Sequence, residues 1–303
     1  MSSKPLYTII IPYFCQEEVA RYLKIAASIS EFPEPNGDVV FLLASSPKTT
    51  PSPDLQDAFS QIGKTLTFAC PTQIFGYPEG PTAMFWDCMD FIADNFGDRP
   101  GFSLWLESDM APTQPNWVDR LSREWFAQSE APLLMGCFVP EIYKRRIFKP
   151  KKLMLNSHIN GGACYSLDFA GRMPQEAREG VFDMAVYPHA LQAGLVKSTG
   201  LIAFSTTQRV RRDLLDRNKV LLHGFMQEKD LFIERCLAPL TVREQRASFF
   251  NPVIDKLEKI SRRLKVHVVR HGKQAMFENM LLTKHDFETS QQHQARHARH
   301  RAA

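Results

Sequence analysis

Residues 102–110 read Phe-Ser-Leu-Trp-Leu-Glu-Ser-Asp-Met, a mostly apolar run that ends in two carboxylates, Glu107 and Asp109. Such a run, stopped by prolines at positions 112 and 115, predicts a strand buried on both faces in the middle of a parallel sheet. Sheets of this kind bind ligands beyond the carboxyl ends of their strands. The two carboxylates are therefore candidates for holding a divalent cation and a substrate phosphate, although a solvated strand end is the simpler interpretation of this stretch alone.

The segments before this stretch alternate between strand and helix patterns. Strand patterns cover residues 7–14, 38–45 and 65–69, and helix patterns cover residues 16–29 and 54–62. This alternation predicts an α/β fold with a parallel, doubly wound sheet and right-handed crossovers. Neither a Gly-x-Gly-x-x-Gly after the first strand nor a Walker loop occurs, so the sequence does not indicate a nicotinamide dehydrogenase or a P-loop enzyme.

Further features follow in order along the chain. A Gly/Pro-rich loop enters a helix over residues 76–92, another helix is expected at 117–126, and a buried strand at 133–140. Two glycines at a strand start in 158–165 allow a close backbone approach to a ligand, or simply a tight turn. A short apolar strand over 219–225 contains His223, which is a candidate ligand or a structural histidine.

Composition describes an ordinary folded protein. The 303 residues are 44% hydrophobic and 23% charged, which is typical of a globular chain with a substantial core. The six cysteines show no CxxC pair, so reduced thiols in the cytoplasm are the simpler expectation. No stretch is apolar over the length of a membrane span or a signal sequence. We therefore expect a cytoplasmic protein.

The C-terminal region differs in charge from the rest. From Arg243 to the end it contains thirteen Lys and Arg against six Asp and Glu. We expect one catalytic domain over 1–242, a basic helical extension over 243–289 and a disordered tail over 290–303. The extension either packs on the domain with a solvated basic face or contacts an anionic membrane peripherally from its inner side. A second basic stretch, 143–152, is either a solvated loop or a contact for a charged substrate.

Taken together, these features resemble the glycosyltransferases of the GT-A fold, a Rossmann-like α/β family, which implies a mixed, mainly parallel sheet flanked by helices. The resemblance covers roughly residues 6–225 and rests on four motifs in order: Glu107-Ser-Asp109, Asn160-Gly-Gly-Ala163, Phe182-Asp183 and His223. Two motifs depart from the family pattern. Glutamate replaces the first aspartate of the Asp-x-Asp motif, and Phe-Asp stands where many inverting members carry Glu-Asp.

The resemblance implies roles for individual residues. Asp109, His223 and Glu107 would hold Mn²⁺ or Mg²⁺, and Asp183, with Glu179 as the second candidate, would be the base that deprotonates an acceptor hydroxyl. The donor nucleotide and sugar would be contacted by Pro12, Tyr13, Phe14, Glu17 or Glu18, Ser45, Ser46, Glu107, Asn160, Gly161, Gly162 and Ala163.

The implied activity is metal-dependent transfer of a sugar from a nucleoside-diphosphate sugar, with a UDP-sugar favoured, to a saccharide or lipid-linked acceptor, as in polysaccharide biosynthesis. Inverting and retaining outcomes both stay open. The alternative is a non-catalytic nucleotide-sugar-binding or scaffolding protein of the same fold. A sugar-1-phosphate nucleotidyltransferase is less favoured, because residues 12–17 do not form a glycine-rich phosphate loop. No motif indicates specific nucleic-acid binding.

Overall fold

The computed structural model of the chain describes residues 4–139, 158–224 and 228–240. All of them belong to one compact unit that ends at Leu240. The predicted basic extension, the predicted disordered tail and the basic stretch 143–152 lie outside the described residues.

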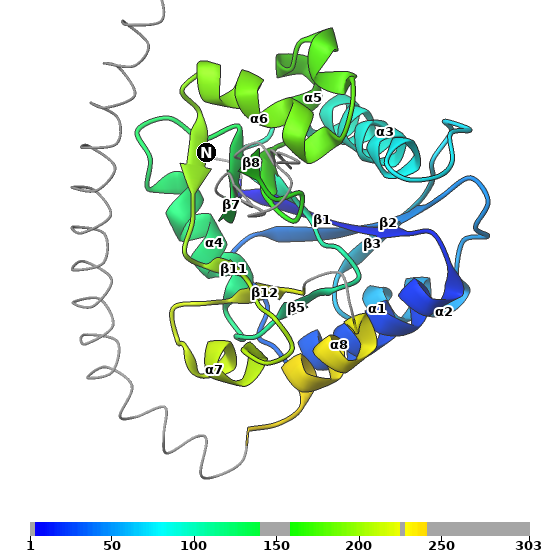
Figure 1. Cartoon of the computed structure of the whole chain (residues 1–303), viewed down its shortest axis with the longest axis vertical. Helices are drawn as coiled ribbons and strands as arrows, with labels where there is room; N and C mark the ends of the chain where they lie inside the picture. The colour runs from blue at the N-terminus through cyan, green and yellow to red at the C-terminus, as the bar shows by residue number, and fades with distance from the viewer. Residues whose placement is uncertain (1–3, 140–157, 225–227, 241–303) are drawn as a thin grey trace, which may run out of the picture. The chain divides into compact units, whose positions relative to one another are not determined.

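The first part of the described chain alternates strands and helices, as the sequence predicts (Figure 1). Its elements are β1 (Leu6–Tyr13), α1 (Gln16–Ile29), β2 (Asp38–Ser45), α2 (Pro53–Ser60), β3 (Lys64–Ala69), α3 (Glu79–Phe96) and β4 (Gly101–Trp105). β1 pairs in parallel with β2 and with β4, and β2 pairs in parallel with β3. These long strands form the regular half of the main sheet.

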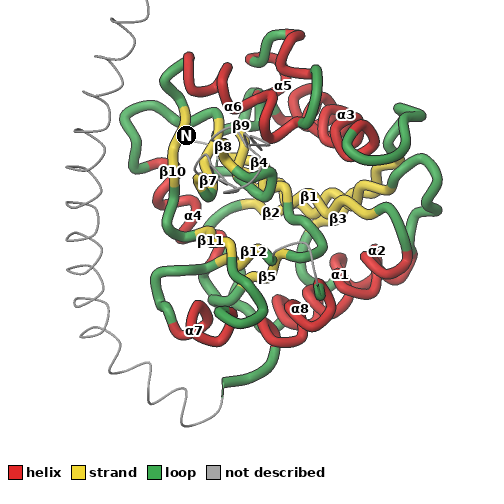
Figure 2. Tube along the Cα trace, in the orientation of Figure 1, coloured by secondary structure: helices red, strands yellow, loops and turns green. Residues whose placement is uncertain are grey.

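The second part consists of shorter elements (Figure 2). Its strands are β5 (Met110–Pro112), β6 (Leu134–Gly136), β7 (Phe138–Val139), β8 (His158–Ile159), β9 (Cys164–Ser166), β10 (Val196–Ser198), β11 (Ile202–Phe204) and β12 (Leu221–His223). Its helices are α4 (Trp117–Phe126), α5 (Phe169–Arg172), the 3-10 helix η1 (Gln175–Arg178), α6 (Phe182–Gln192), α7 (Val210–Leu215) and α8 (Lys229–Leu237).

The main sheet has the strand order β10-β6-β9-β4-β1-β2-β3. β9 runs antiparallel to both of its neighbours, β4 and β6, and the other pairs are parallel. The predicted mixed, mainly parallel sheet is therefore confirmed. A smaller sheet of order β11-β12-β5 stands beside it, and β7 pairs with β8.

Helices cover both faces of the main sheet because the strands are apolar on both faces (Figure 1). Along β1, Tyr7, Ile9 and Ile11 belong to the core shared with α1, α2 and α4. Leu6 and Ile10 point the other way, into the core shared with α3, α5 and α6. This alternation is the two-residue period of a strand. The buried sheet leaves the carboxyl ends of β1, β2 and β4 as its functional edge.

Candidate functional site: a carboxylate and histidine cluster at the strand ends

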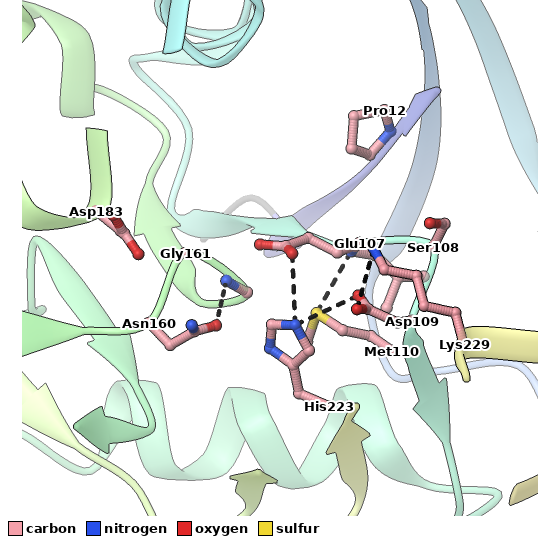
Figure 3. Close-up of polar contacts among 12 residues, drawn as sticks. Pro12, Glu107, Ser108, Asp109, Met110, Asn160, Gly161, Asp183, His223 and Lys229 are labelled. Carbon is pink, nitrogen blue, oxygen red and sulfur yellow. Dashed lines mark hydrogen bonds and ion pairs between the residues drawn. The ribbon is translucent and has the colours of Figure 1, made fainter. Parts of the chain in front are cut away.

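Glu107 and Asp109 lie in a tight turn that follows β4, as predicted, and His223 is the last residue of β12. The small sheet joins them, because β12 pairs antiparallel with β5 and sets His223 opposite Met110. The turn is closed by the Met110 amide, which donates to the Glu107 carbonyl at 2.9 Å, and the Gly224 amide donates to the Asp109 carbonyl at 2.7 Å. Backbone pairing thus brings residues more than a hundred positions apart into one cluster (Figure 3).

The side chains of this acid cluster, defined as Glu107, Asp109 and His223, converge. His223 Nε2 lies 3.4 Å from a Glu107 oxygen and 3.3 Å from Asp109 Oδ1. Lys229, the first residue of α8, places Nζ 3.1 Å from Asp109 Oδ2. In the described part of the chain, the acid cluster is a group whose ligand atoms could hold one ion, all lying within 4.8 Å of one another.

The acid cluster fits a hard divalent cation. The side chains of Asp109 and His223 are each 5% exposed, and Asp109 Oδ1 makes no hydrogen bond and has only the charge contact with His223 Nε2 at 3.3 Å. Polar atoms left unpaired in a protein interior are costly unless another partner satisfies them. Two carboxylates and an imidazole are donors that suit Mn²⁺ or Mg²⁺, so the predicted ligand set is physically consistent.

Charge pairing within the acid cluster shifts two pKa values in opposite directions. Burial would raise the pKa of the Asp109 carboxyl, but His223 and Lys229 outweigh it and lower that pKa from 3.8 to about 2. Burial would lower the pKa of the His223 imidazole, but Glu107 and Asp109 raise it from 6.5 to about 10. Without a metal, His223 is therefore a cation held between two carboxylates at neutral pH.

The glycine pair of the predicted motif lies against the acid cluster. A Cβ on Gly161 would stand 2.6 Å from the Phe182 ring and 3.1 Å from a Glu107 oxygen. A Cβ on Gly162 would stand 2.4 Å from the Met110 sulfur and 3.0 Å from His223 Nδ1. A side chain at either position would displace these groups, so the two glycines let the backbone lie close to the acid cluster.

Two more residues of this loop shape it. The side-chain oxygen of Asn160 accepts a hydrogen bond from the Gly162 amide at 3.2 Å, which folds the loop on itself. Ala163 is fully buried. Asn160 is thus engaged within the loop and Ala163 in the core, and their predicted contacts with a donor stay predictions.

Asp183, the predicted base, lies in the first turn of α6. In Figure 3, Asn160 and Gly161 lie between it and the acid cluster. Its side chain is 17% exposed and one oxygen lies 3.7 Å from His158 Nε2. Burial raises the pKa of the Asp183 carboxyl, and nearby Glu107 adds to the rise although His158 opposes it. The second candidate, Glu179, is exposed at the end of η1.

The residues predicted to contact the nucleotide fall into three groups: buried, exposed and lining a pocket. Pro12, Tyr13 and Ser45 are buried at the tips of β1 and β2, and the Tyr13 hydroxyl accepts a hydrogen bond from the Ser52 amide. Glu17 is exposed on α1. Phe14 and Ser46 line an open pocket.

This strand-tip pocket has a volume of about 410 Å³. It is lined by residues following β1, β2 and β3 and by the start of α3: Phe14, Ser46, Pro47, Lys48, Cys70, Thr72, Ile74, Phe75, Gly76, Tyr77, Gly80, Pro81 and Met84. Lys48 Nζ stands 3.7 Å from the centre of the Phe75 ring. The lining is apolar and aromatic with one cation and no carboxylate, which suits a planar, uncharged ring.

Several residues at this edge are not anticipated from the sequence. Lys229, Lys48 and His158 reach the edge from segments whose path the sequence does not predict. Glu18, expected as the alternative to Glu17 beside the nucleotide, lies in helical phase with buried Tyr22 and Ile25 and therefore faces inward. Its neighbour Glu17 points to solvent.

Among the helices in the described ranges, none combines the length and the apolar character needed to cross a bilayer. No protein-family model and no curated protein sequence matches the chain. The fold and the acid cluster define an α/β domain with a candidate cation site at its strand ends.

Solved structures give the nearest comparison. The chain is similar to the galactosyltransferase LgtC in complex with donor and acceptor sugar analogues, at 12% identity over 80% of this chain and 99% of that one, with a TM-score of 0.45. It is also similar to 4-diphosphocytidyl-2C-methyl-D-erythritol synthase, at 11% identity over 78% and 99% of the two chains, with a TM-score of 0.46.

A third similar structure is that of residues 1–349 of Staphylococcus aureus TarS in complex with UDP. It shares 10% identity over 77% of this chain and 64% of that one, with a TM-score of 0.45. Glycosyltransferases are thus among the structural neighbours, as the sequence resemblance predicts. At these identities the likeness concerns the fold alone.

Proposed function

We propose that the chain is a metal-dependent glycosyltransferase that moves a sugar from a nucleoside-diphosphate sugar, with a UDP-sugar favoured, to a saccharide or lipid-linked acceptor. The observation that carries the proposal is the convergence of Glu107, Asp109 and His223, whose ligand atoms all lie within 4.8 Å of one another. Burying charged groups costs several kcal/mol each before their pairing is counted, so a buried charge cluster is weak evidence for a purely stabilising role. Binding of a divalent cation by the acid cluster would offset this cost.

The residues of the acid cluster would together stabilise the negative charge of the leaving group. A bound Mn²⁺ or Mg²⁺ would supply positive charge where the departing diphosphate becomes more negative. Asp109, Glu107 and His223 would hold it. Lys229, whose side chain is 33% exposed and lies against Asp109, would add a second positive charge on the solvent side of the cluster.

The acceptor would be activated on the other side of the glycine loop. Asp183 would take the proton from an acceptor hydroxyl at its carboxylate oxygen, as an inverting transfer requires. Its raised pKa makes the carboxylate a stronger base than an exposed aspartate. Its side chain is 17% exposed, so part of the carboxylate can be reached from solvent.

The strand-tip pocket would take the nucleobase. Phe14 connects it to the acid cluster, because the Phe14 amide donates to Glu18 and Glu18 accepts from Ser108 between the two acids. Phe75 and Tyr77 are 40% and 77% exposed, which leaves their rings available for stacking on a base.

The proposal is tested with a thermal-shift panel of UDP, GDP, CMP and ADP, each with and without Mn²⁺. A ligand that binds the folded state raises the melting temperature according to its occupancy. We expect one nucleotide, UDP first, to stabilise the wild type only when Mn²⁺ is present. The matching nucleotide-sugar should then release its nucleotide in the presence of acceptor.

Asp109→Asn serves as the variant in the same panel. It should fold but lose the metal-dependent stabilisation. If neither protein responds to any nucleotide, the donor site is wrong. If the wild type responds to metal and nucleotide but never turns over a nucleotide-sugar, the chain is a binding protein of the same fold.

A further inference from the structure

The acid turn is the segment 106–110, which carries Glu107 and Asp109. Helix α1 contacts this turn through two side chains one helical turn apart, Glu18 and Tyr22. Tyr22 is fully buried, and its hydroxyl lies 2.9 Å from the Pro12 carbonyl and 2.8 Å from the Leu106 carbonyl. Glu18 accepts a hydrogen bond from the Phe14 amide at 2.7 Å and another from the Ser108 hydroxyl at 3.2 Å. Each side chain therefore connects the end of β1 with a residue next to Glu107 or Asp109.

These contacts lie just beyond the point where backbone hydrogen bonds between β1 and β4 end. The last backbone hydrogen bond between the two strands runs from the Leu106 amide to the Ile10 carbonyl, at 3.0 Å. Beyond it the chain turns away from β1 toward β5, and Glu107 follows at once. The Tyr22 hydroxyl and the Glu18 carboxylate take over at this point, since each joins atoms on both sides of the divergence.

We propose that Glu18 and Tyr22 are positioning residues that set the geometry of the acid turn for cation binding. Neither belongs to the acid cluster, and neither contributes one of its ligand atoms. Their role would be that of outer groups that orient ligands, whose loss typically lowers metal affinity by about 10- to 100-fold. The inference rests on the proposed function, because it assumes that the acid cluster binds a divalent ion.

The chain offers a matched control for each contact. Tyr7 is also a core tyrosine, 1% exposed, and its hydroxyl lies 2.6 Å from the Ser122 hydroxyl, away from the acid turn. Tyr22→Phe and Tyr7→Phe each remove one buried hydroxyl without changing charge. Ser108→Ala and Ser122→Ala form a second pair, in which the first member removes the contact of Glu18 with the turn and keeps the Glu18 carboxylate.

The experiment measures Mn²⁺ dissociation constants of the full chain from the EPR signal of free Mn²⁺, together with melting temperatures. Tyr22→Phe should raise the dissociation constant about tenfold, and Ser108→Ala several-fold. Tyr7→Phe and Ser122→Ala should lower the melting temperature comparably and leave Mn²⁺ affinity unchanged. Affinity, unlike melting, does not respond to a merely structural role.

Equal Mn²⁺ affinity in wild type, Tyr22→Phe and Ser108→Ala would overturn the inference while leaving the cation site in place. If Tyr22→Phe does not fold, the Ser108→Ala and Ser122→Ala pair decides alone. A wild type that binds no Mn²⁺ would overturn the proposed function, and this inference with it.

Discussion

The acid cluster and the strand-tip pocket occupy the same edge of one sheet, but they are built in opposite ways. The acid cluster buries Asp109 and His223 beside Glu107, whose side chain is 31% exposed. The pocket is open, apolar and aromatic, and Lys48 is its single charged group. One region concentrates charge inside the protein, and the other offers shape and ring faces at the surface.

Because of this difference, the acid cluster says more about function than the strand-tip pocket does. An apolar pocket of a few hundred Å³ arises readily where loops meet and fits many ligands. Buried charges are costly and are satisfied only by specific partners, so the cluster restricts the chemistry far more. The two regions should therefore respond to substitution in separable ways, the first through metal affinity and the second through nucleotide affinity.

The largest effect is expected from Asp109→Asn. The amide keeps the shape but removes the charge that faces His223 and Lys229, and an amide is a weaker ligand than a carboxylate. Mn²⁺ affinity should fall by at least about 100-fold in a titration followed by EPR. Asp213→Asn is the matched control, because Asp213 is also a mostly buried carboxylate, paired with Ser205 and Lys219. An equal loss in both variants would mean that general destabilisation explains the result.

The second effect is the pH dependence of the acid cluster. Because the pKa of His223 in the folded protein is about 10, above its ordinary 6.5, the protonated imidazole stabilises the metal-free fold. This contribution is complete below pH 6.5 and is lost as the pH rises toward 10. The melting temperature of the metal-free protein should therefore fall over this range, and His223→Gln should flatten the curve.

Mn²⁺ affinity should show the opposite trend, since His223 must lose a proton to become a ligand. It should rise about tenfold per pH unit over neutral pH. An affinity that does not change with pH would remove His223 from the ligand set.

Gly162→Ala should have a smaller effect on the same site. Its Cβ would stand 2.4 Å from the Met110 sulfur, which accepts a hydrogen bond from the Glu107 amide. Met110 is fully buried, so relieving the contact must disturb the acid turn. We expect a loss of about 1–3 kcal/mol in unfolding free energy, measured by urea denaturation, and about tenfold weaker Mn²⁺ binding. Gly200→Ala, where a Cβ meets nothing within 4 Å, should do neither.

The smallest effect concerns the pocket. Lys48→Met removes the cation over Phe75, a contact worth about 0.5–1 kcal/mol at an exposed site. Nucleotide affinity measured by calorimetry should fall about two- to fivefold, while Mn²⁺ affinity in the absence of nucleotide should not change. Lys64→Met, on exposed Lys64 of β3, provides the control. A change in Mn²⁺ affinity would mean that the two regions are not separable.

The regular half of the fold could be predicted from the sequence because its strands and helices have clear periods. The strands at β1 and β2 and the helix at α1 all form where the patterns indicate. Glu107, Asp109 and His223 also come together as the resemblance implies. Their meeting depends on the pairing of β5 with β12, which no local pattern of these three-residue strands reveals.

The nucleotide contacts were harder to predict because successive side chains at a strand end point to opposite faces of the sheet. Ser45 is 1% exposed and faces the interior, whereas Ser46 lines the pocket one residue later. The same holds for Glu17 and Glu18, which a helical phase separates. Much of the pocket wall comes from the loop before α3, where Gly76 has a φ of 86°. Such a loop path follows from tertiary packing rather than from periodicity.

Glu107, Asp109 and His223 are proposed to bind one divalent ion beside a nucleoside diphosphate. Pulsed EPR of Mn²⁺ bound to the wild type can show this, because couplings to ¹⁴N and ³¹P identify the atoms next to the ion. We expect a ¹⁴N coupling that disappears in His223→Gln, and a ³¹P coupling when UDP is added. Bound Mn²⁺ with neither coupling, or with a ¹⁴N coupling that survives in His223→Gln, would contradict it.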